Sequence, residues 1–420
     1  CFQRTSSVAG VSNIDRIVDR TVMLLKKRAS GNPEKPYDVY IPEIDGLKLT
    51  KAGYFVEGSR DRVLQQMEDE ISRSNVLILS EFIGYGKRSI IKKYVEQNHN
   101  RYTTAIMVHN EHANLREFFS FGLTFLNVNE NVFAELQEEA LIREKFKFLG
   151  KLDSRTLLVI PDVHFELQPD TALCEMLAGL KCHVLLLTQE SANGYEDWFP
   201  VIRVGRMNDD HLYELFFHHY IRAFEEEKEA LRAPLTKFFS NIGGHTKTVE
   251  LTAATLNRDM AVPVEELPRY LSMHSGEGMQ LKDRILQQIG NIFDPDRLGT
   301  EACVALLVAA YTAVPYISEK HYRDILRQCG VENWQVVTEL DKLRWLDEDI
   351  QNRTVSVEPL VAQIVFAKLP KNYYVMCCCL DYLYEHLRKY FSFTVMGSET
   401  VHIMNKLTYF FTVTELPECA

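Results

Sequence analysis

The stretch at residues 75–96 constrains the fold more than any other part of this chain. Residues 75–80 read NVLILS, a short and continuously apolar run that is typical of a strand buried on both faces of a sheet. A turn that contains Gly84 and Gly86 follows, and residues 90–96 have the apolar spacing of a helix. A strand, a glycine-bearing turn and a helix in direct succession predict one unit of a parallel sheet covered by helices.

The same alternation of strands and helices continues as far as residue 204, and the remainder of the chain reads as helical with one short hairpin at 345–357. The predicted strands are residues 75–80, 102–108, 155–160 and 182–188, and the predicted helices between and after them include residues 90–96, 115–125, 132–149, 209–228, 234–241, 246–257 and 281–292. Residues 301–357 then run helix, helix, helix, hairpin, which is the order of a winged-helix module. The fold class is therefore an α/β domain followed by helical domains.

The composition excludes several classes of function. The chain has 420 residues and a net charge of −11, so a general electrostatic footprint on nucleic acid is not expected. No apolar run reaches the roughly 18–20 residues that would span a bilayer. The nine cysteines are odd in number and scattered, so we expect reduced thiols and a cytoplasmic protein. The chain begins with Cys1 rather than Met, so we expect it to be cut from a longer protein.

Residues 80–89 read SEFIGYGKRS and partly match a phosphate-binding loop, G-x-x-x-x-G-K-[ST], which connects a strand to a helix. In such a loop the backbone N–H groups surround phosphate oxygens, and the helix N-terminus favours the anion. Gly86 and Lys87 supply the central pair of the motif, and Gly84 adds backbone freedom. Both flanking elements are in the expected places, so the loop is a candidate phosphate site.

Two positions of this loop depart from the motif. Glu81 stands at the first glycine, where it adds bulk and negative charge. Arg88 stands where a Ser or Thr hydroxyl would hold Mg²⁺, and Ser89 comes one residue late. Taken alone, the loop is equally well interpreted as an ordinary strand-to-helix turn.

Five landmarks between residues 54 and 366 resemble, in their order and spacing, those of the bacterial STAND (NB-ARC-like) signalling ATPases. They are YFV at 54–56 before the strand and loop, RTLLVIPDVHF at 155–165, HVLLLTQE at 183–190, NIGGHTKTVELTAATL at 241–256 and LRWLDEDIQNRTVSVEPLVAQIVF at 343–366. This is an analogy at the level of the fold. It implies a P-loop NTPase domain, a helical domain, a winged-helix domain and the start of a further helical region such as a helical repeat array.

The resemblance divides the chain into five segments and assigns a role to the flanks. The segments are residues 1–50, the tail of a preceding domain plus a linker; 51–205, the nucleotide-binding α/β domain; 206–275, the helical domain; 276–370, the winged-helix domain; and 371–420, the further helical region. In this family such a module regulates a flanking effector by conformational change or oligomerisation. We therefore expect protein partners or self-association, no membrane, no nucleic acid, and effector and sensor domains outside this chain.

The same comparison shows that the residues expected to touch phosphate or metal have changed. The Walker B acid is displaced by Pro161, so that Asp162 comes one residue late, and His164 stands where a second acid is common. Gln189 occupies the position of the sensor arginine, and Glu358 replaces the winged-helix histidine that faces the diphosphate in the family. With both metal anchors altered, little or no ATP hydrolysis is expected, and Mg²⁺ is not expected to be held.

Several outcomes stay open at this point. In the first outcome, ADP or ATP binds through the residues that the resemblance assigns to nucleotide, which are Gly84, Gly86, Lys87, Arg88, Ser89 and Thr188. Alternatively, Glu81 and Glu358 pair with Arg88 or Lys87 and fill the pocket with a salt bridge. A second hypothesis is a working ATPase with a shifted metal site built from Ser89 and Asp162. A third hypothesis is a transcription regulator that binds DNA through its winged helix.

Overall fold

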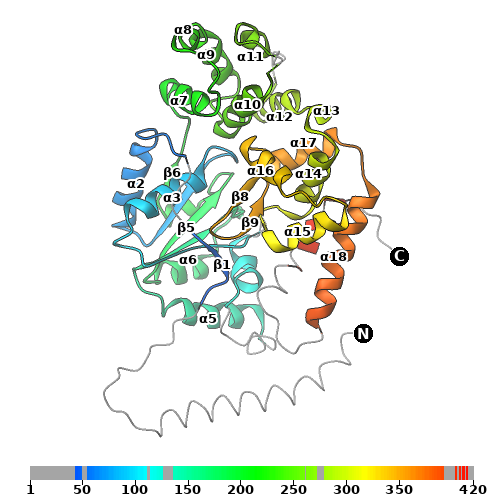
Figure 1. The fold of residues 1–420 in the computed structure, drawn as a ribbon. Coiled ribbons are helices and arrows are strands. Elements are labelled where there is room, and N and C mark those ends of the chain that lie inside the picture. Colours follow the sequence, from blue (N-terminus) through cyan, green and yellow to red (C-terminus); the bar gives the residue numbers. More distant parts are fainter. Residues whose placement is uncertain are drawn as a thin grey trace.

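The computed structural model describes residues 43–49, 54–110, 114–125, 136–260, 262–271 and 279–391, with single positions between 403 and 414. Figure 1 shows a sheet flanked by helices, a helical region at one end of it, and a further module of helices and a small sheet at its side. The expected tail of a preceding domain lies outside the described residues up to position 42. In the described part, no helix is both long and apolar enough to cross a membrane.

A six-stranded sheet with the order β1-β3-β4-β5-β2-β6 forms the centre of the first part. Strand β1 runs antiparallel to β3, and the other neighbours are parallel. The four apolar strands predicted from the sequence are confirmed as the inner four. The strands are β1 (Gly46–Lys48), β2 (Val76–Ser80), β3 (Thr104–Val108), β4 (Thr156–Ile160), β5 (His183–Thr188) and β6 (Val201–Arg203).

The two edge strands were not predicted. Each has three residues and no continuous apolar run, so neither carries the signal that marks the inner strands. Strand β1 lies in the segment assigned to a linker, and its pairing with β3 makes residues 46–48 part of the sheet. The α/β domain therefore begins before residue 51.

Side chains along the inner strands alternate between two cores. In β2, Val76 and Ile78 belong to one hydrophobic cluster, and Leu77 and Leu79 belong to the other. The first core includes side chains of α5 (Glu138–Leu149) and α6 (Thr171–Ala178), and the second includes those of α2 (Asp61–Ile71) and α3 (Lys87–Gln97). Burial on both faces explains why the inner strands have continuous apolar runs, with polar residues only at their ends.

The segment after β3 differs from the predicted helix at 115–125. It forms a single turn of helix α4 (Leu115–Glu117), a π-helix η1 (Phe118–Gly122) and then extended chain. The buried amine of Lys145 donates to the carbonyls of Ser120 (2.9 Å) and Leu123 (2.6 Å) at the end of the π-helix. A cation from α5 thus satisfies carbonyls that a regular helix would have paired internally.

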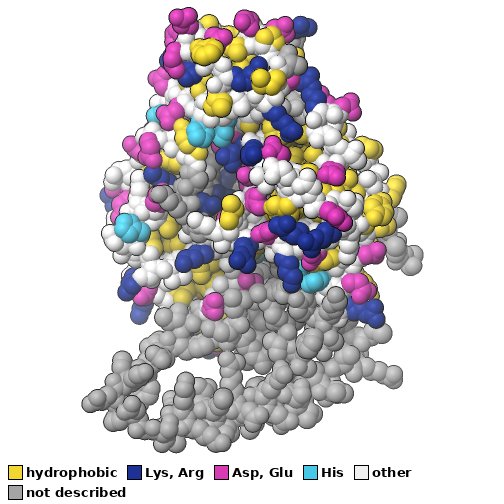
Figure 2. Space-filling view, viewed as in Figure 1, with side chains coloured by type: hydrophobic (Ala, Val, Ile, Leu, Met, Phe, Trp, Pro, Cys, Tyr) yellow, Lys and Arg dark blue, Asp and Glu magenta, His cyan; other side chains and the backbone are white. Residues whose placement is uncertain are grey.

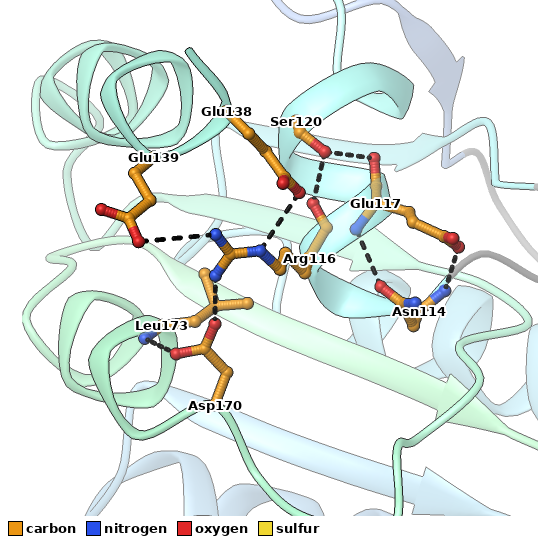
Figure 3. A network of polar contacts seen from close by, with 8 residues as sticks. All are labelled: Asn114, Arg116, Glu117, Ser120, Glu138, Glu139, Asp170 and Leu173. Carbon is orange, nitrogen blue, oxygen red and sulfur yellow. Dashed lines mark hydrogen bonds and ion pairs between the residues drawn. The ribbon is translucent and has the colours of Figure 1, made fainter.

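Arg116 fixes the same segment to two neighbouring helices (Figure 3). Its guanidinium contacts Glu138 (3.1 Å) and Glu139 (3.9 Å) at the start of α5. It also contacts Asp170 (2.8 Å), whose other oxygen caps α6 at the backbone N–H of Leu173. This network lies apart from the loop after β2, and we assign it a structural role.

The helical region contains α7 (Asp209–His219), α8 (Glu225–Ala230), α9 (Arg232–Asn241), α10 (Thr246–Arg258), α11 (Leu267–Leu271) and α12 (Leu281–Ile292). The single helix predicted at 209–228 is interrupted after α7. There the N–H of Ile221 donates to the side chain of Asn257 (2.9 Å), and Arg222 donates to the carbonyls of Leu256 and Asp259 at the end of α10. These contacts hold residues 220–224 in a non-helical connection that no periodicity indicates.

The last module consists of α13 (Pro295–Leu298), α14 (Thr300–Thr312), β7 (Ile317–Ser318), α15 (Glu319–Gln328), α16 (Gln335–Lys342), β8 (Asp347–Asp349), β9 (Thr354–Ser356) and α17 (Pro359–Lys368), followed by α18 (Tyr373–Phe391). Three antiparallel strands in the order β7-β9-β8 form its small sheet. One hydrophobic core runs through the helical region and this module. The two therefore pack as a continuous body against the α/β domain.

Candidate functional site

A cavity of about 450 Å³ lies where the α/β domain, the helical region and the last module meet. Its walls carry both cations and carboxylates, and Figure 2 shows such side chains close together around the hollow at the centre of this face. The lining includes Tyr54, Gly84, Gly86, Lys87, Arg88, Ser89, Lys92, Asp162, His219, Thr246, Lys247, Glu250, Arg344, Asp347, Asp349 and Glu358. Most of the residues that sequence analysis assigned to nucleotide are brought together here.

The loop after β2 has the backbone of an anion-binding turn. Gly84 and Gly86 have φ angles of 84° and 86°, in the left-handed region that side chains with a Cβ avoid. Helix α3 begins at Lys87, and the N–H groups of its first turn have no acceptor within the helix. Loop and helix end therefore direct N–H groups and a positive partial charge toward the cavity.

His245, at the start of α10, packs directly on this loop. A Cβ added at Gly84 would lie 2.1 Å from His245 Nε2, so only glycine fits there. Burial lowers the pKa of His245 to about 4, so its ring is neutral. Nδ1 accepts the backbone N–H of Thr248 (3.3 Å), which leaves Nε2 to donate to the carbonyl of Ile83 (2.7 Å).

Three further contacts join the loop to the helical region. The hydroxyl of Thr246 donates to the carbonyl of Gly84 (2.6 Å), and the N–H of Lys247 donates to the same carbonyl (3.1 Å). The hydroxyl of Tyr85 donates to the carbonyl of Gly243 (3.0 Å). With His245, the contacts of Thr246 and Lys247 occupy the carbonyls of Ile83 and Gly84, whereas Tyr85 donates from the loop to the helical region.

Lys87 and Glu81 are both engaged by backbone groups. The buried amine of Lys87 donates to the carbonyls of Glu81 and Phe82, and burial lowers its pKa to about 8. The carboxylate of Glu81 accepts the N–H groups of Phe82 (3.0 Å) and Gly205 (2.9 Å). The alternative in which Glu81 pairs with Lys87 or Arg88 does not appear among the ion pairs of the described residues, because backbone N–H groups satisfy this carboxylate instead.

Arg88 and Asp162 face each other on the side of the cavity where a metal would be expected. The guanidinium lies 3.8 Å from Asp162 Oδ2, and the side-chain amide of Gln189 donates to Oδ1 (3.1 Å). Asp162 has a φ of 49°, and Asn110 donates to the preceding carbonyl of Pro161 (2.8 Å). The displaced acid of the β4 strand thus reaches the loop, but its nearest cation is an arginine.

The residues present do not fit Mg²⁺. The loop position that should supply a hydroxyl is Arg88, and a divalent ion beside a guanidinium would be repelled. No group of three His, Cys, Asp or Glu side chains suited to a metal occurs among the described residues. The phosphate part of the cavity, by contrast, fits an anion through the loop, helix α3 and Lys87.

The hairpin β8-β9 covers the cavity from the last module. Lys247 contacts the carboxylate of Asp347 (3.4 Å), and Lys92 of α3 contacts Asp349 (3.9 Å). The side chain of Asn352 donates to the carbonyl of Lys48 in β1 (3.0 Å). These contacts connect the hairpin to both other parts of the molecule.

Glu250 and Glu358 line this junction, and neither forms an ion pair with another described residue. Loss of water raises the pKa of Glu358 and of Glu250, and the positive charge of Lys247 lowers both in part. One alternative left open by the sequence paired Glu358 with Arg88 or Lys87. Arg88 instead has Asp162 as its ion-pair partner, and Lys87 donates to backbone carbonyls.

Thr188 is not brought to the cavity. It is fully buried at the end of β5, and its hydroxyl accepts the N–H of Glu190 (3.1 Å), which closes a turn. Conversely, His245, Thr246 and Lys247 contact the loop or line the cavity, and none of them was predicted as a site residue. The sequence marks these three residues only as the start of a helix after Gly243 and Gly244. That pattern indicates the boundary of an element and does not show which loop the helix packs on.

Tyr54 and the end of α7 form another wall of the cavity that was not predicted. The Tyr54 ring stacks on His218, with ring centroids 3.3 Å apart and planes 7° apart, and its hydroxyl donates to Glu214 (3.0 Å). The neighbouring His219 lines the cavity, and burial lowers its pKa to about 3. An uncharged aromatic wall thus stands opposite the charged loop.

No protein-family model matches the sequence, and no curated protein does. Among solved structures, the fold is similar to a signal transduction ATPase with numerous domains (STAND) from Pyrococcus horikoshii, which has a tetratricopeptide repeat sensor. The TM-score is 0.51 at 13% identity, over 88% of this chain and 53% of that one, so this chain spans about half the length of the STAND protein.

Weaker similarities are found with two other archaeal proteins. The Walker-type ATPase of Pyrococcus abyssi gives a TM-score of 0.34 at 13% identity, over 73% of this chain and 95% of that chain. Cdc6p of Pyrobaculum aerophilum gives 0.33 at 14% identity, over 76% and 97%. With the geometry above, the chain has a P-loop NTPase fold with an attached helical region, and it shares that fold with a STAND protein.

Proposed function

We propose that this chain is the switch portion of a STAND-like signalling protein, which binds ADP or ATP in the central cavity and does not hydrolyse it. One observation carries the proposal: an anion-binding loop is contacted by the helical region and lies beneath a hairpin of the last module. A ligand at that place touches all three parts, so its binding free energy is coupled to their arrangement.

The phosphate end of the ligand is assigned to the loop after β2. The N–H groups around Gly84 and Gly86 and the first turn of α3 would hold phosphate oxygens. Lys87, whose pKa of about 8 leaves it mostly protonated at neutral pH, would exchange its loop carbonyls for a phosphate oxygen. The aromatic wall of Tyr54 and His219 suits the uncharged end of a nucleotide.

Hydrolysis is not part of this proposal, because phosphoryl transfer needs a metal ion to neutralise charge and a group to orient water. Arg88 stands in the metal position and Gln189 engages Asp162. An ATPase built from Ser89 and Asp162 would require the guanidinium to leave and an ion to replace it. We therefore assign the cavity to binding alone.

We further propose that the last module is a winged helix that acts as the moving part of the switch. Its element order, with the three-stranded sheet, supports this assignment. The side of the module that faces the cavity carries Asp341, Asp347, Glu348 and Asp349, which disfavours phosphate backbone on that side. Partners of the switch would be a second copy or flanking effector and sensor domains.

The test is calorimetric titration of nucleotide-free protein with ADP and with ATP. We expect binding by the native protein and a loss of about tenfold or more in Lys87→Ala, since one charged hydrogen-bond donor to phosphate is removed. Lys147→Ala is the matched control, because Lys147 lies on α5 and its partner is Glu144. Equal binding by both variants, or none by the native protein, would refute the assignment.

A further inference from the structure

Arg88 stands where the motif has the hydroxyl that would hold Mg²⁺, so another group must neutralise the phosphates of a bound nucleotide. We propose that the Arg88 guanidinium takes the place of the metal ion, so that the cavity selects the nucleotide di- or triphosphate without bound Mg²⁺. This inference rests on the proposed function and names the form of its ligand.

The position of Arg88 is the first support. It is the second residue of α3, directly after Lys87, and it lines the cavity beside Ser89. Its side chain is 38% exposed, so it is free to turn toward a ligand. A guanidinium stays charged at all relevant pH values and binds phosphate oxygens through two parallel N–H groups. At this place it can meet the oxygens that a metal would otherwise bridge.

The surroundings of Asp162 are the second support. In a metal site this acid would hold the ion, directly or through water, but here Oδ2 faces Arg88 and Oδ1 accepts from Gln189. Asn110 fixes the backbone next to it through the carbonyl of Pro161. Asp162 is thus held in an orientation that directs Arg88 along the cavity wall. The 3.8 Å separation is long for an ion pair, so phosphate competes for the guanidinium at little cost.

The charges of the cavity are the third support. Lys92, Lys247 and Arg344 each have an aspartate of the hairpin as their partner, at 3.9, 3.4 and 4.0 Å. Lys87 and Arg88 are consecutive at the start of α3, and a divalent ion at the phosphate end of the cavity would have to lie close to both. These two charges repel such an ion and attract the oxygens of a bare polyphosphate at this end of the cavity. The carboxylates of the lining other than Asp162 belong to the helical region and the last module.

The experiment compares ADP binding in EDTA with binding in excess Mg²⁺, using nucleotide-free native protein and calorimetry. We expect the dissociation constant in EDTA to be equal to or lower than in Mg²⁺. In Arg88→Thr, which restores the hydroxyl, we expect binding in EDTA to weaken by about tenfold, as for one lost bidentate contact, with Mg²⁺ restoring part of it. Arg88→Lys keeps the charge and should lie between the two.

Asp162→Asn separates the two explanations of this acid. If Asp162 only directs Arg88, its loss leaves ADP binding in EDTA unchanged or tighter, because a negative charge near phosphate is removed. If Asp162 anchors a metal, its loss weakens binding in Mg²⁺. Melting temperatures of all variants without ligand verify that each one is folded, and the native comparison decides the matter should Arg88→Thr fail to fold.

The outcomes distinguish the inference from the function on which it rests. Native protein that binds ADP only with Mg²⁺ overturns the role of Arg88 and leaves the switch intact. Native protein that binds ADP in neither condition overturns both. Binding in EDTA that Arg88→Thr does not weaken also overturns the inference, since another group must then neutralise the phosphates.

Discussion

The phosphate side and the metal side of the cavity match the pattern of a phosphate-binding loop to different extents. On the phosphate side, Gly84 and Gly86 keep the left-handed backbone of the loop, and α3 begins where an anion would sit. On the metal side, Arg88 and Gln189 contact the two carboxylate oxygens of Asp162. Geometry that depends on the backbone is retained, whereas geometry that depends on side-chain ligands is replaced. This difference is what a protein that binds nucleotide without hydrolysing it would require.

The largest effect is expected from a change on the phosphate side, Gly84→Ala. A Cβ there would meet His245 Nε2 at 2.1 Å, and the φ of 84° is unfavourable for alanine. We expect a loss of about 2–4 kcal/mol in the free energy of unfolding, from backbone strain together with overpacking. Chemical denaturation measures it.

Gly205→Ala is the matched control for this substitution. Gly205 also has a positive φ, of 68°, but a Cβ there would have no atom within 4 Å. It should therefore show only the strain, about 1 kcal/mol. Equal losses of unfolding free energy in the two variants would mean that His245 does not constrain the loop. The loop would then not be in close contact with the helical region.

An intermediate effect is expected at the junction, from Glu358→Gln. The folded-state pKa of Glu358 is raised above its ordinary value of 4.5 by burial, with Lys247 and Arg88 lowering it and Asp347 and Asp162 raising it. The folded state thus binds this proton more tightly than the unfolded state. The stability that this provides is complete below pH 4.5 and is lost as pH rises through the raised folded value.

Glutamine mimics the protonated acid, so Glu358→Gln should match the native protein near pH 4 and exceed it at neutral pH. The difference should be about 1.4 kcal/mol for each unit by which the pKa is raised. Denaturation curves across this pH range measure it. Parallel curves for the two proteins would show that Glu358 is ionised in the folded state and that the junction is more hydrated than it is here.

The smallest effect is expected from Thr188→Ala. Its hydroxyl accepts the N–H of Glu190 and does not face the cavity. We expect a loss of about 1 kcal/mol of stability, for one hydrogen bond, and no change in ADP affinity. A clear loss of affinity in a folded Thr188→Ala protein would return this residue to the site and extend the functional cavity to the end of β5.

Periodicity and apolar runs were sufficient for the inner sheet and for the order of the elements after it. Residues such as Leu77 and Ile78 must be apolar because both faces of β2 are buried, and that requirement is visible in the sequence. The same reasoning failed at β1 and β6, where three residues pair at an edge with little burial. It also failed at η1, where Lys145 makes an irregular helix acceptable by satisfying its carbonyls.

Part of the candidate site was likewise predictable from the sequence, and part was not. The sequence by itself determined the strand, the glycine turn, Lys87 and the misplaced Arg88 and Asp162, because these are neighbours along the chain or follow a recognisable strand. Tertiary structure alone decided that His245 packs on Gly84, that Arg88 faces Asp162 and that Thr188 turns away. Those relations join residues far apart in the chain, and their energies arise only once burial has brought the groups together and removed the water between them.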